Sequence, residues 1–211
     1  MATMLEDITE LKTLPKSSPS KVTFEEYLEW DSESGYVEWV DGEIEIMPNP
    51  SLKHQEIINF LTFIMNGYNA KHDLGKILPA PFAMKLEAIS RGREPDILFV
   101  SKERRNLFEK NYLNGAADVA VEVISPGTGR KDRGDKYFEY EVSGISEYWL
   151  IDPDRQHAEF YRLGEDKLYH TVSLQADNVF HSETIPGFWF RVEWLWHIPN
   201  ELVALRELGV I

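Results

Sequence analysis

Two short apolar runs, each containing an acidic residue, dominate the pattern of hydrophobic and polar positions along the chain. Residues 94–100 and 118–126 are rich in Val, Ile, Leu and Phe, are bounded by turn-forming residues and are too short for typical helices. Both runs are therefore predicted to be buried strands. A carboxylate inside such a strand is costly to bury unless a cation or a hydrogen-bond donor meets it, so Asp96 and Glu122 require an explanation.

The pattern before the first of these runs predicts a short helix, a hairpin and a longer helix. A reciprocal capping pattern favours a helix over residues 23–30. Residues 36–40 and 43–47 alternate in polarity around an Asp-Gly pair, which is typical of a tight hairpin. Apolar residues at spacings of three and four over 51–68 predict a helix that carries His54 on its buried face.

The rest of the chain continues as alternating strands and helices. A right-handed crossover from the Glu122 strand would make the apolar run at 147–153 its parallel neighbour, and the helix between them would carry Lys136 and Tyr140 on one face. The remaining expected elements are a strand over 76–87 interrupted by Pro79 and Pro81, a short helix with a loop over 101–117, the crossover helix over 132–142, a hairpin of 158–162 with 168–174, and an aromatic segment over 180–196 followed by a helix or loop.

The length and composition fit one globular unit. The chain has 211 residues, which suits a flexible N-terminal arm over 1–20 and one domain over 21–211. It contains no Cys, so disulfides and thiolate metal sites are excluded. No apolar run approaches the length that spans a membrane and the N-terminus is polar, which predicts a cytoplasmic protein with no membrane partner.

The net charge of −14 argues against a nucleic-acid partner, because phosphate binding normally depends on Lys and Arg. Basic residues nevertheless cluster near the two acid-bearing runs. They could form a local positive rim, or simply a solvated charged face. These residues are Arg91, Arg93, Lys102, Arg104, Arg105, Arg130, Lys131, Arg133 and Lys136.

Two carboxylates that converge from neighbouring strands would suit a hard divalent cation. If the two runs lie side by side, Asp96 at the start of one and Glu122 within the other could project toward one point. Mg²⁺ prefers oxygen ligands and keeps several waters, so it is the cation that this pair favours.

A Pro-Asp pair followed after an interval by Glu in a hydrophobic strand resembles the PD-(D/E)XK nuclease superfamily. The Lys expected two residues after the Glu is replaced by Ile124, but in one branch this Lys lies on the following helix, where Lys136 is found. With these features the chain resembles the Uma-two family of bacterial endonucleases over residues 22–192. The motifs that carry the resemblance are Tyr36-x-Glu38-x-x-Asp41-Gly42-Glu43, His54, Pro95-Asp96, Glu122-Val-Ile-Ser-Pro, Asp132-x-x-x-Lys136-x-x-x-Tyr140 and Glu147-Tyr148-Trp149-Leu150-Ile151-Asp152-Pro153.

The resemblance implies a fold and a site. The fold is α/β: a restriction-endonuclease-like mixed β-sheet core flanked by helices, with a C-terminal β extension. The implied activity is metal-dependent hydrolysis of phosphodiester bonds in nucleic acid, with DNA as the expected substrate, by a Mg-dependent endonuclease for which Mn²⁺ could substitute. Asp96, Glu122 and the Val123 carbonyl would hold the ion, Lys136 would steady the attacking water or a phosphate oxygen, and His54 and Glu38 would join the catalytic set.

Two other functions are compatible with the same residues. The chain could be a catalytically inactive interaction or dimerisation module with vestigial ligands, and a homodimer is possible in either case. It could also be a glycoside hydrolase that uses Asp96 and Glu122 as an acid pair, although its sequence has no visible sugar-binding platform. Activity that survives EDTA would favour the glycosidase, and the absence of both Mg²⁺ binding and nicking would favour the inactive module.

Overall fold

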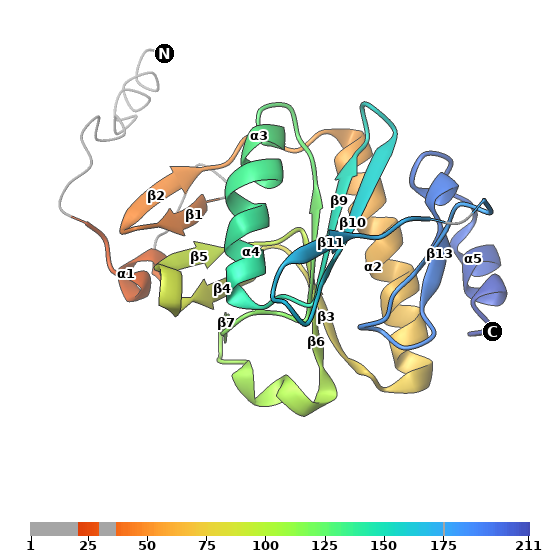
Figure 1. The fold of residues 1–211 in the computed structure, drawn as a ribbon, viewed down its shortest axis with the longest axis horizontal. Coiled ribbons are helices and arrows are strands. Elements are labelled where there is room, and N and C mark those ends of the chain that lie inside the picture. Colours follow the sequence, from red (N-terminus) through yellow and green to blue (C-terminus); the bar gives the residue numbers. More distant parts are fainter. Residues whose placement is uncertain (1–20, 30–36, 175) are drawn as a thin grey trace, which may run out of the picture.

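The two acid-bearing runs form adjacent strands of a six-stranded mixed sheet (Figure 1). In this computed structural model, which describes residues 21–29, 37–174 and 176–211, β6 (Ile97–Ser101) pairs antiparallel with β8 (Val119–Val123). The next strand, β9 (Glu147–Asp152), is parallel to β8, as the predicted crossover requires. The outer strands are β10 (His157–Leu163) and β11 (Tyr169–Thr171) on one side and β3 (Gly75–Pro79) on the other.

Successive side chains of these strands point to opposite faces of the sheet. Both faces carry apolar side chains, and helices cover both. On one face, odd-numbered residues such as Phe99 and Val121 pack in one core with α2 (Leu52–His72). On the other face, even-numbered residues such as Leu98 and Ala120 pack with Tyr140. Glu122 has the parity of this second face, so its side chain lies on the side of the sheet that the crossover helix covers.

Both flanking helices are longer than the sequence pattern predicts. Ser51 caps α2 as expected, but the helix continues to His72 and ends at Asp73 in a left-handed conformation. The crossover helix spans residues 129–143 as α3 (Gly129–Lys131), a π-helical turn η3 (Asp132–Lys136) and α4 (Tyr137–Ser143). π-helical turns inside α-helices are frequent at functional sites.

A second, five-stranded sheet lies beside the central one, at the left in Figure 1. The helix α1 (Phe24–Leu28) packs on it and has the predicted capping box, in which Thr23 and Glu26 bond each other's backbone amides. The predicted hairpin is also found, although Tyr36 and the arm over 1–20 lie outside the described residues. In spatial order the strands are β2 (Glu43–Ile46), β1 (Val37–Val40), β5 (Arg91–Arg93), β4 (Ala83–Leu86) and β7 (Tyr112–Asn114).

The strand predicted over 76–87 is broken at Pro79 and Pro81 as expected, but its two parts belong to different sheets. The chain leaves the central sheet after Pro79, at the end of the edge strand β3, and enters the second sheet as β4, which pairs with both β5 and β7. Proline cannot donate to a strand ladder, so the segment of Pro79 to Pro81 separates two strands. Short 3₁₀-helices follow at η1 (Glu87–Ile89) and η2 (Lys102–Leu107).

The C-terminal extension closes the opposite end of the molecule. It comprises β12 (Val179–His181), β13 (Trp189–Arg191), η4 (Val192–Leu195) and α5 (Glu201–Glu207), and its aromatic side chains join the core beneath α2. Glu147 of β9, whose exposed fraction is 0%, anchors this extension. Its carboxylate accepts hydrogen bonds from the Ser182 hydroxyl at 2.8 Å and from the amides of Glu183 and Thr184 at 2.7 and 3.1 Å. Among the described helices, none has the length and hydrophobicity to cross a bilayer.

We expect Glu147→Ala to destabilise the protein by about 3 kcal/mol or more, because it leaves several buried donors without an acceptor. Urea unfolding followed by circular dichroism measures the loss as a lower midpoint. Glu183→Ala is the matched control, because the Glu183 side chain is 75% exposed and its Arg162 pair lies at the surface. Equal midpoints for the two variants would contradict this account of the anchor.

Candidate active site

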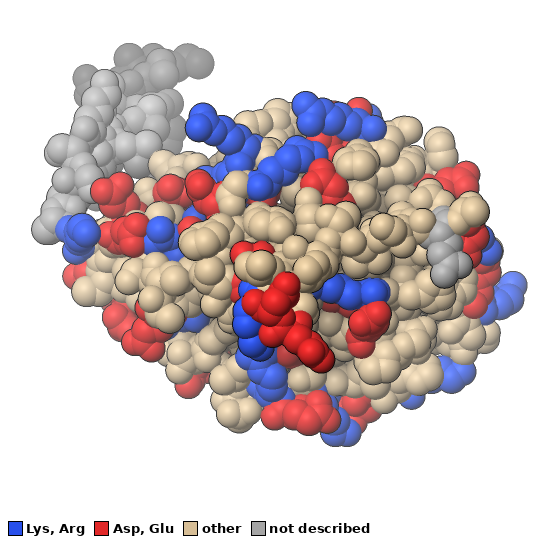
Figure 2. Space-filling model, in the orientation of Figure 1, with Lys and Arg blue, Asp and Glu red and all other residues tan. Residues whose placement is uncertain are grey.

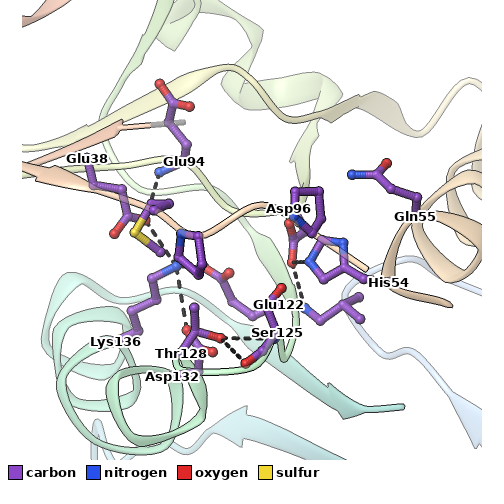
Figure 3. Close-up of a pocket in the computed structure, with 14 residues that line it drawn as sticks. Glu38, His54, Gln55, Glu94, Asp96, Glu122, Ser125, Thr128, Asp132 and Lys136 are labelled. Carbon is purple, nitrogen blue, oxygen red and sulfur yellow. Dashed lines mark hydrogen bonds and ion pairs between the residues drawn. The ribbon is translucent and has the colours of Figure 1, made fainter. Parts of the chain in front are cut away.

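All of the predicted site residues line one pocket. It lies where β6 begins and β8 ends, between the segment that connects β2 to α2 and the start of the crossover helix (Figure 3). Its volume of about 50 Å³ exceeds the space that a single water needs. The predicted residues that line it are Glu38, His54, Asp96, Glu122, Val123 and Lys136.

Glu122 is 4% exposed, and one of its two carboxylate oxygens is held by two donors. Its Oε1 accepts hydrogen bonds from Lys136 Nζ at 2.8 Å and from the Tyr140 hydroxyl at 2.6 Å. Both donors come from the helix that follows β8 along the chain. No described residue donates a hydrogen bond to Oε2, so that oxygen keeps its lone pairs for a ligand.

Asp96 has the same division between its two oxygens. Its Oδ2 accepts a hydrogen bond from the Val123 amide at 2.7 Å and lies 3.3 Å from His54 Nε2. Asp96 immediately precedes β6, at the end of the sheet where the first turn of α2 carries His54. In the described part of the chain no donor reaches Oδ1. The other His54 nitrogen, Nδ1, is buried without a hydrogen-bond partner among those residues.

The ammonium group of Lys136 connects three acids. Its Nζ lies 2.8 Å from Glu122, 3.0 Å from Glu38 and 3.7 Å from Asp132, and the residue is only 2% exposed. Burial alone would lower the pKa of Lys136, but these carboxylates outweigh it and raise the pKa well above the ordinary value. The lysine is therefore charged and directed into the pocket.

The pocket contains more negative than positive charge. Burial raises the pKa of Glu122 above its ordinary value, Lys136 opposes this shift, and the carboxylates of Asp96, Asp132 and Glu38 add to it. Burial also raises the pKa of Asp132, although the nearby Lys136 ammonium lowers it in part. An additional cation in the pocket would stabilise the ionised forms of these acids.

The sequence did not identify every residue of the site. The sequence puts Tyr140 on the same helix face as Lys136 but does not indicate its hydrogen bond to Glu122. Asp132 and Glu94 line the pocket as well. The spacing of four residues between Asp132, Lys136 and Tyr140 was the available signal, because such residues share one face of a helix. Glu94 is held by the Tyr27 hydroxyl at 2.7 Å, a contact that no local pattern indicates.

Most of the basic residues that could have formed a positive rim are ion-paired elsewhere. Arg91 and Arg93 bind Glu139, Arg104 binds Asp118, and Lys102 and Arg105 bind Asp73. Lys131 binds Glu45 and Arg133 binds Asp152. Acidic and basic side chains are interspersed over the surface in Figure 2, with Lys and Arg gathered where α3 begins. There Arg130 is exposed and makes no ion pair with a described residue.

The sequence model of the Uma2 family, described as "Putative restriction endonuclease", matches residues 24–193. The chain belongs to the Uma2 family. A crystal structure of "a putative nuclease belonging to DUF820 from Anabaena variabilis ATCC 29413" has the same fold, with a TM-score of 0.68 at 19% sequence identity, over 83% of this chain and 98% of that one. A search of curated proteins gave no match.

The donor set of this Uma2 chain fits a hard cation held by few protein ligands. Within the described residues, no group of three or more His, Asp and Glu side chains is arranged to hold a metal ion. Asp96 Oδ1 and Glu122 Oε2, however, lack hydrogen-bond donors and belong to residues that line the same pocket. Mg²⁺ commonly binds proteins through one or two carboxylates and retains several waters, so two oxygens are a sufficient protein contribution.

Proposed function

We propose that this Uma2 chain is a metal-dependent endonuclease that hydrolyses phosphodiester bonds in nucleic acid, with DNA as its substrate. The observation that carries the proposal is the pair of carboxylates, each with one oxygen fixed by donors and one without, next to a buried lysine. Family membership supports the class of reaction. The net charge of −14 makes the pocket, rather than the general surface, the expected contact with phosphate.

Asp96, Glu122 and the Val123 carbonyl would hold Mg²⁺, for which Mn²⁺ could substitute. When bound, such an ion supplies Lewis-acid stabilisation of charge on the phosphate and makes a water more acidic. The chain's own groups fix the geometry around it. His54 and the Val123 amide orient Asp96, and Lys136 and Tyr140 orient Glu122.

Lys136 has a second task in this proposal. Its ammonium is held by Glu38 and Glu122 and faces the pocket, so it could donate a hydrogen bond to a nonbridging phosphate oxygen or to the attacking water. Hydrolysis then forms a bond from phosphorus to the water oxygen and breaks the bond to the leaving oxygen, which receives a proton. Lys136 is the one Lys or Arg among the described residues that line the pocket, so it could stabilise the negative charge that develops on the phosphate.

We expect Asp96→Asn and Glu122→Gln each to abolish Mg²⁺ binding and DNA nicking, because each removes one of two charged ligands. Isothermal titration calorimetry with Mg²⁺ and Mn²⁺ measures binding, and nicking of supercoiled plasmid at low salt measures activity. Asp135→Asn is the control: it removes one charge from an exposed position beside Lys136. Cleavage retained by both ligand variants, or by the wild type in excess EDTA, would refute the mechanism.

Lys136→Met should still bind Mg²⁺ but cleave about a hundredfold more slowly or worse, because a positioned donor to the phosphate is lost while the ligands remain. The replacement also leaves acids without their cation, so thermal unfolding is recorded with and without Mg²⁺ to verify the fold. Lys131→Met provides the comparison, because Lys131 lies on the same helix but pairs with Glu45. Loss of Mg²⁺ binding in Lys136→Met would show that the lysine builds the metal site instead.

Tyr140→Phe removes only the hydroxyl that holds Glu122 Oε1, and we expect it to weaken metal affinity or activity about 10- to 100-fold. The ring and its packing against Tyr148 are kept. Tyr169→Phe is a matched change in the same core, because the Tyr169 hydroxyl donates to the Ile145 carbonyl and not to a pocket residue. If the two variants lose metal affinity equally, Tyr140 has no specific effect on Glu122.

A further inference from the structure

Arg93 is a buried arginine that does not itself line the pocket but contacts Glu38, which does. It lies on β5 of the second sheet, and its exposed fraction is 1%. Its guanidinium donates to Glu139 of α4 twice, from Nε at 2.8 Å and from Nη2 at 2.9 Å. Its Nη1 donates to Glu38 Oε2 at 2.7 Å. One planar group therefore joins β1 and β5 to the crossover helix.

The Glu38 carboxylate is divided between two cations. Oε2 receives the Arg93 hydrogen bond, and Oε1 lies 3.0 Å from Lys136 Nζ. Lys136 in turn contacts Glu122. The result is a chain of alternating charge from Arg93 through Glu38 and Lys136 to Glu122, in which every member is nearly excluded from water. At such low exposure each charge depends on its neighbours, because water cannot replace a lost partner.

We propose that Arg93 is a positioning residue for the reaction. By donating a hydrogen bond to Glu38 Oε2, it fixes the carboxylate that holds the Lys136 ammonium at Glu122. The role of Arg93 in the reaction rests on the proposed function, whereas its positioning of Lys136 does not. An arginine suits the role because its rigid fork binds Glu139 with two donors and still presents a third to Glu38, which a lysine could not do. Without Arg93, Glu38 would lose the donor that fixes its Oε2, and Lys136 its fixed partner.

The competing interpretation is that Arg93 only attaches the second sheet to the crossover helix. Arg91 allows the two to be separated. It lies on the same strand and also binds Glu139, through Nε at 2.6 Å, but it makes no contact with Glu38. A purely structural contribution would therefore be shared by the two arginines, whereas positioning of Lys136 would belong to Arg93 alone.

The experiment measures how fast the Lys136 amine reacts with an amine-directed acylating reagent, read by peptide mass spectrometry with exposed Lys110 as internal reference. In the wild type, Lys136 should be protected. Arg93→Gln should increase its labelling about tenfold or more, because the loss of a charge-assisted hydrogen bond favours release of the amine. Arg91→Gln should leave the labelling within about twofold of the wild type, since it leaves Glu38 in place. Equal increases in both variants would overturn the proposal.

A double-mutant cycle tests the route. In a Glu38→Gln background, Arg93→Gln should produce no further labelling of Lys136, because the connection is already broken. If the effects of Arg93→Gln and Glu38→Gln on the labelling of Lys136 multiply, Arg93 acts on the fold and not through Glu38. If Arg93→Gln does not fold, as judged by thermal unfolding, Arg93→Lys carries the same expectation, because it keeps a charge but not the fork.

Activity provides a separate readout. Arg93→Gln should lower kcat for plasmid nicking, because Lys136 is no longer held where it can donate to the phosphate. A wild type that cuts no nucleic acid would refute the proposed function, and the labelling ratio would still decide whether Arg93 positions Lys136. Labelling of Lys136 that stays at the wild-type level in Arg93→Gln would refute the inference alone.

Discussion

The burial of one carboxylate, Glu122, inside a central strand is the constraint on which the site depends. Such a group is tolerated only where donors meet it, and both of its donors come from the helix that follows its own strand. The connection between them is short and fixed: the Ser125 amide donates to the Thr128 hydroxyl at 3.0 Å. The helix begins at Gly129, and Lys136 and Tyr140 face back toward the strand. The need to satisfy Glu122 and the need to cover the sheet are met by the same packing.

The pocket is a junction of two sheets. The central sheet contributes Asp96 and Glu122 at neighbouring strand ends, and the second sheet contributes Glu38. Arg93 holds Glu38 and the crossover helix together, so the second sheet cannot move away from the pocket without exposing buried charges. An ionic network of this kind is not strong evidence for stability, but it specifies one arrangement, because each partner has a single place where its charge is compensated.

The sequence predicted the part of the site that depends on short-range rules. The strand pattern was sufficient to bring Asp96 and Glu122 together, and the family resemblance placed Lys136 with them; their roles there are proposals. The second sheet was largely missed because β5 and β7 have only three residues each and carry no periodic signal. The partners of Arg93 were missed because they lie 55 and 46 residues away, at Glu38 and Glu139. A run of basic residues likewise gives no information on acids that are distant in sequence, and Arg105 and Asp73 are 32 positions apart.

The charge balance of the pocket connects ion binding with substrate binding. Among the described residues, five acids line it (Glu38, Glu94, Asp96, Glu122 and Asp132) but only one lysine does. A phosphate that entered the pocket without a further cation would face uncompensated carboxylates at short distance and low dielectric, where repulsion is strong. Bound Mg²⁺ would offset part of this negative charge next to Lys136. An acidic protein can therefore act on a polyanion if the cation that completes the site also creates the local attraction, and in such an enzyme the affinity for nucleic acid should depend on the metal more than on surface charge.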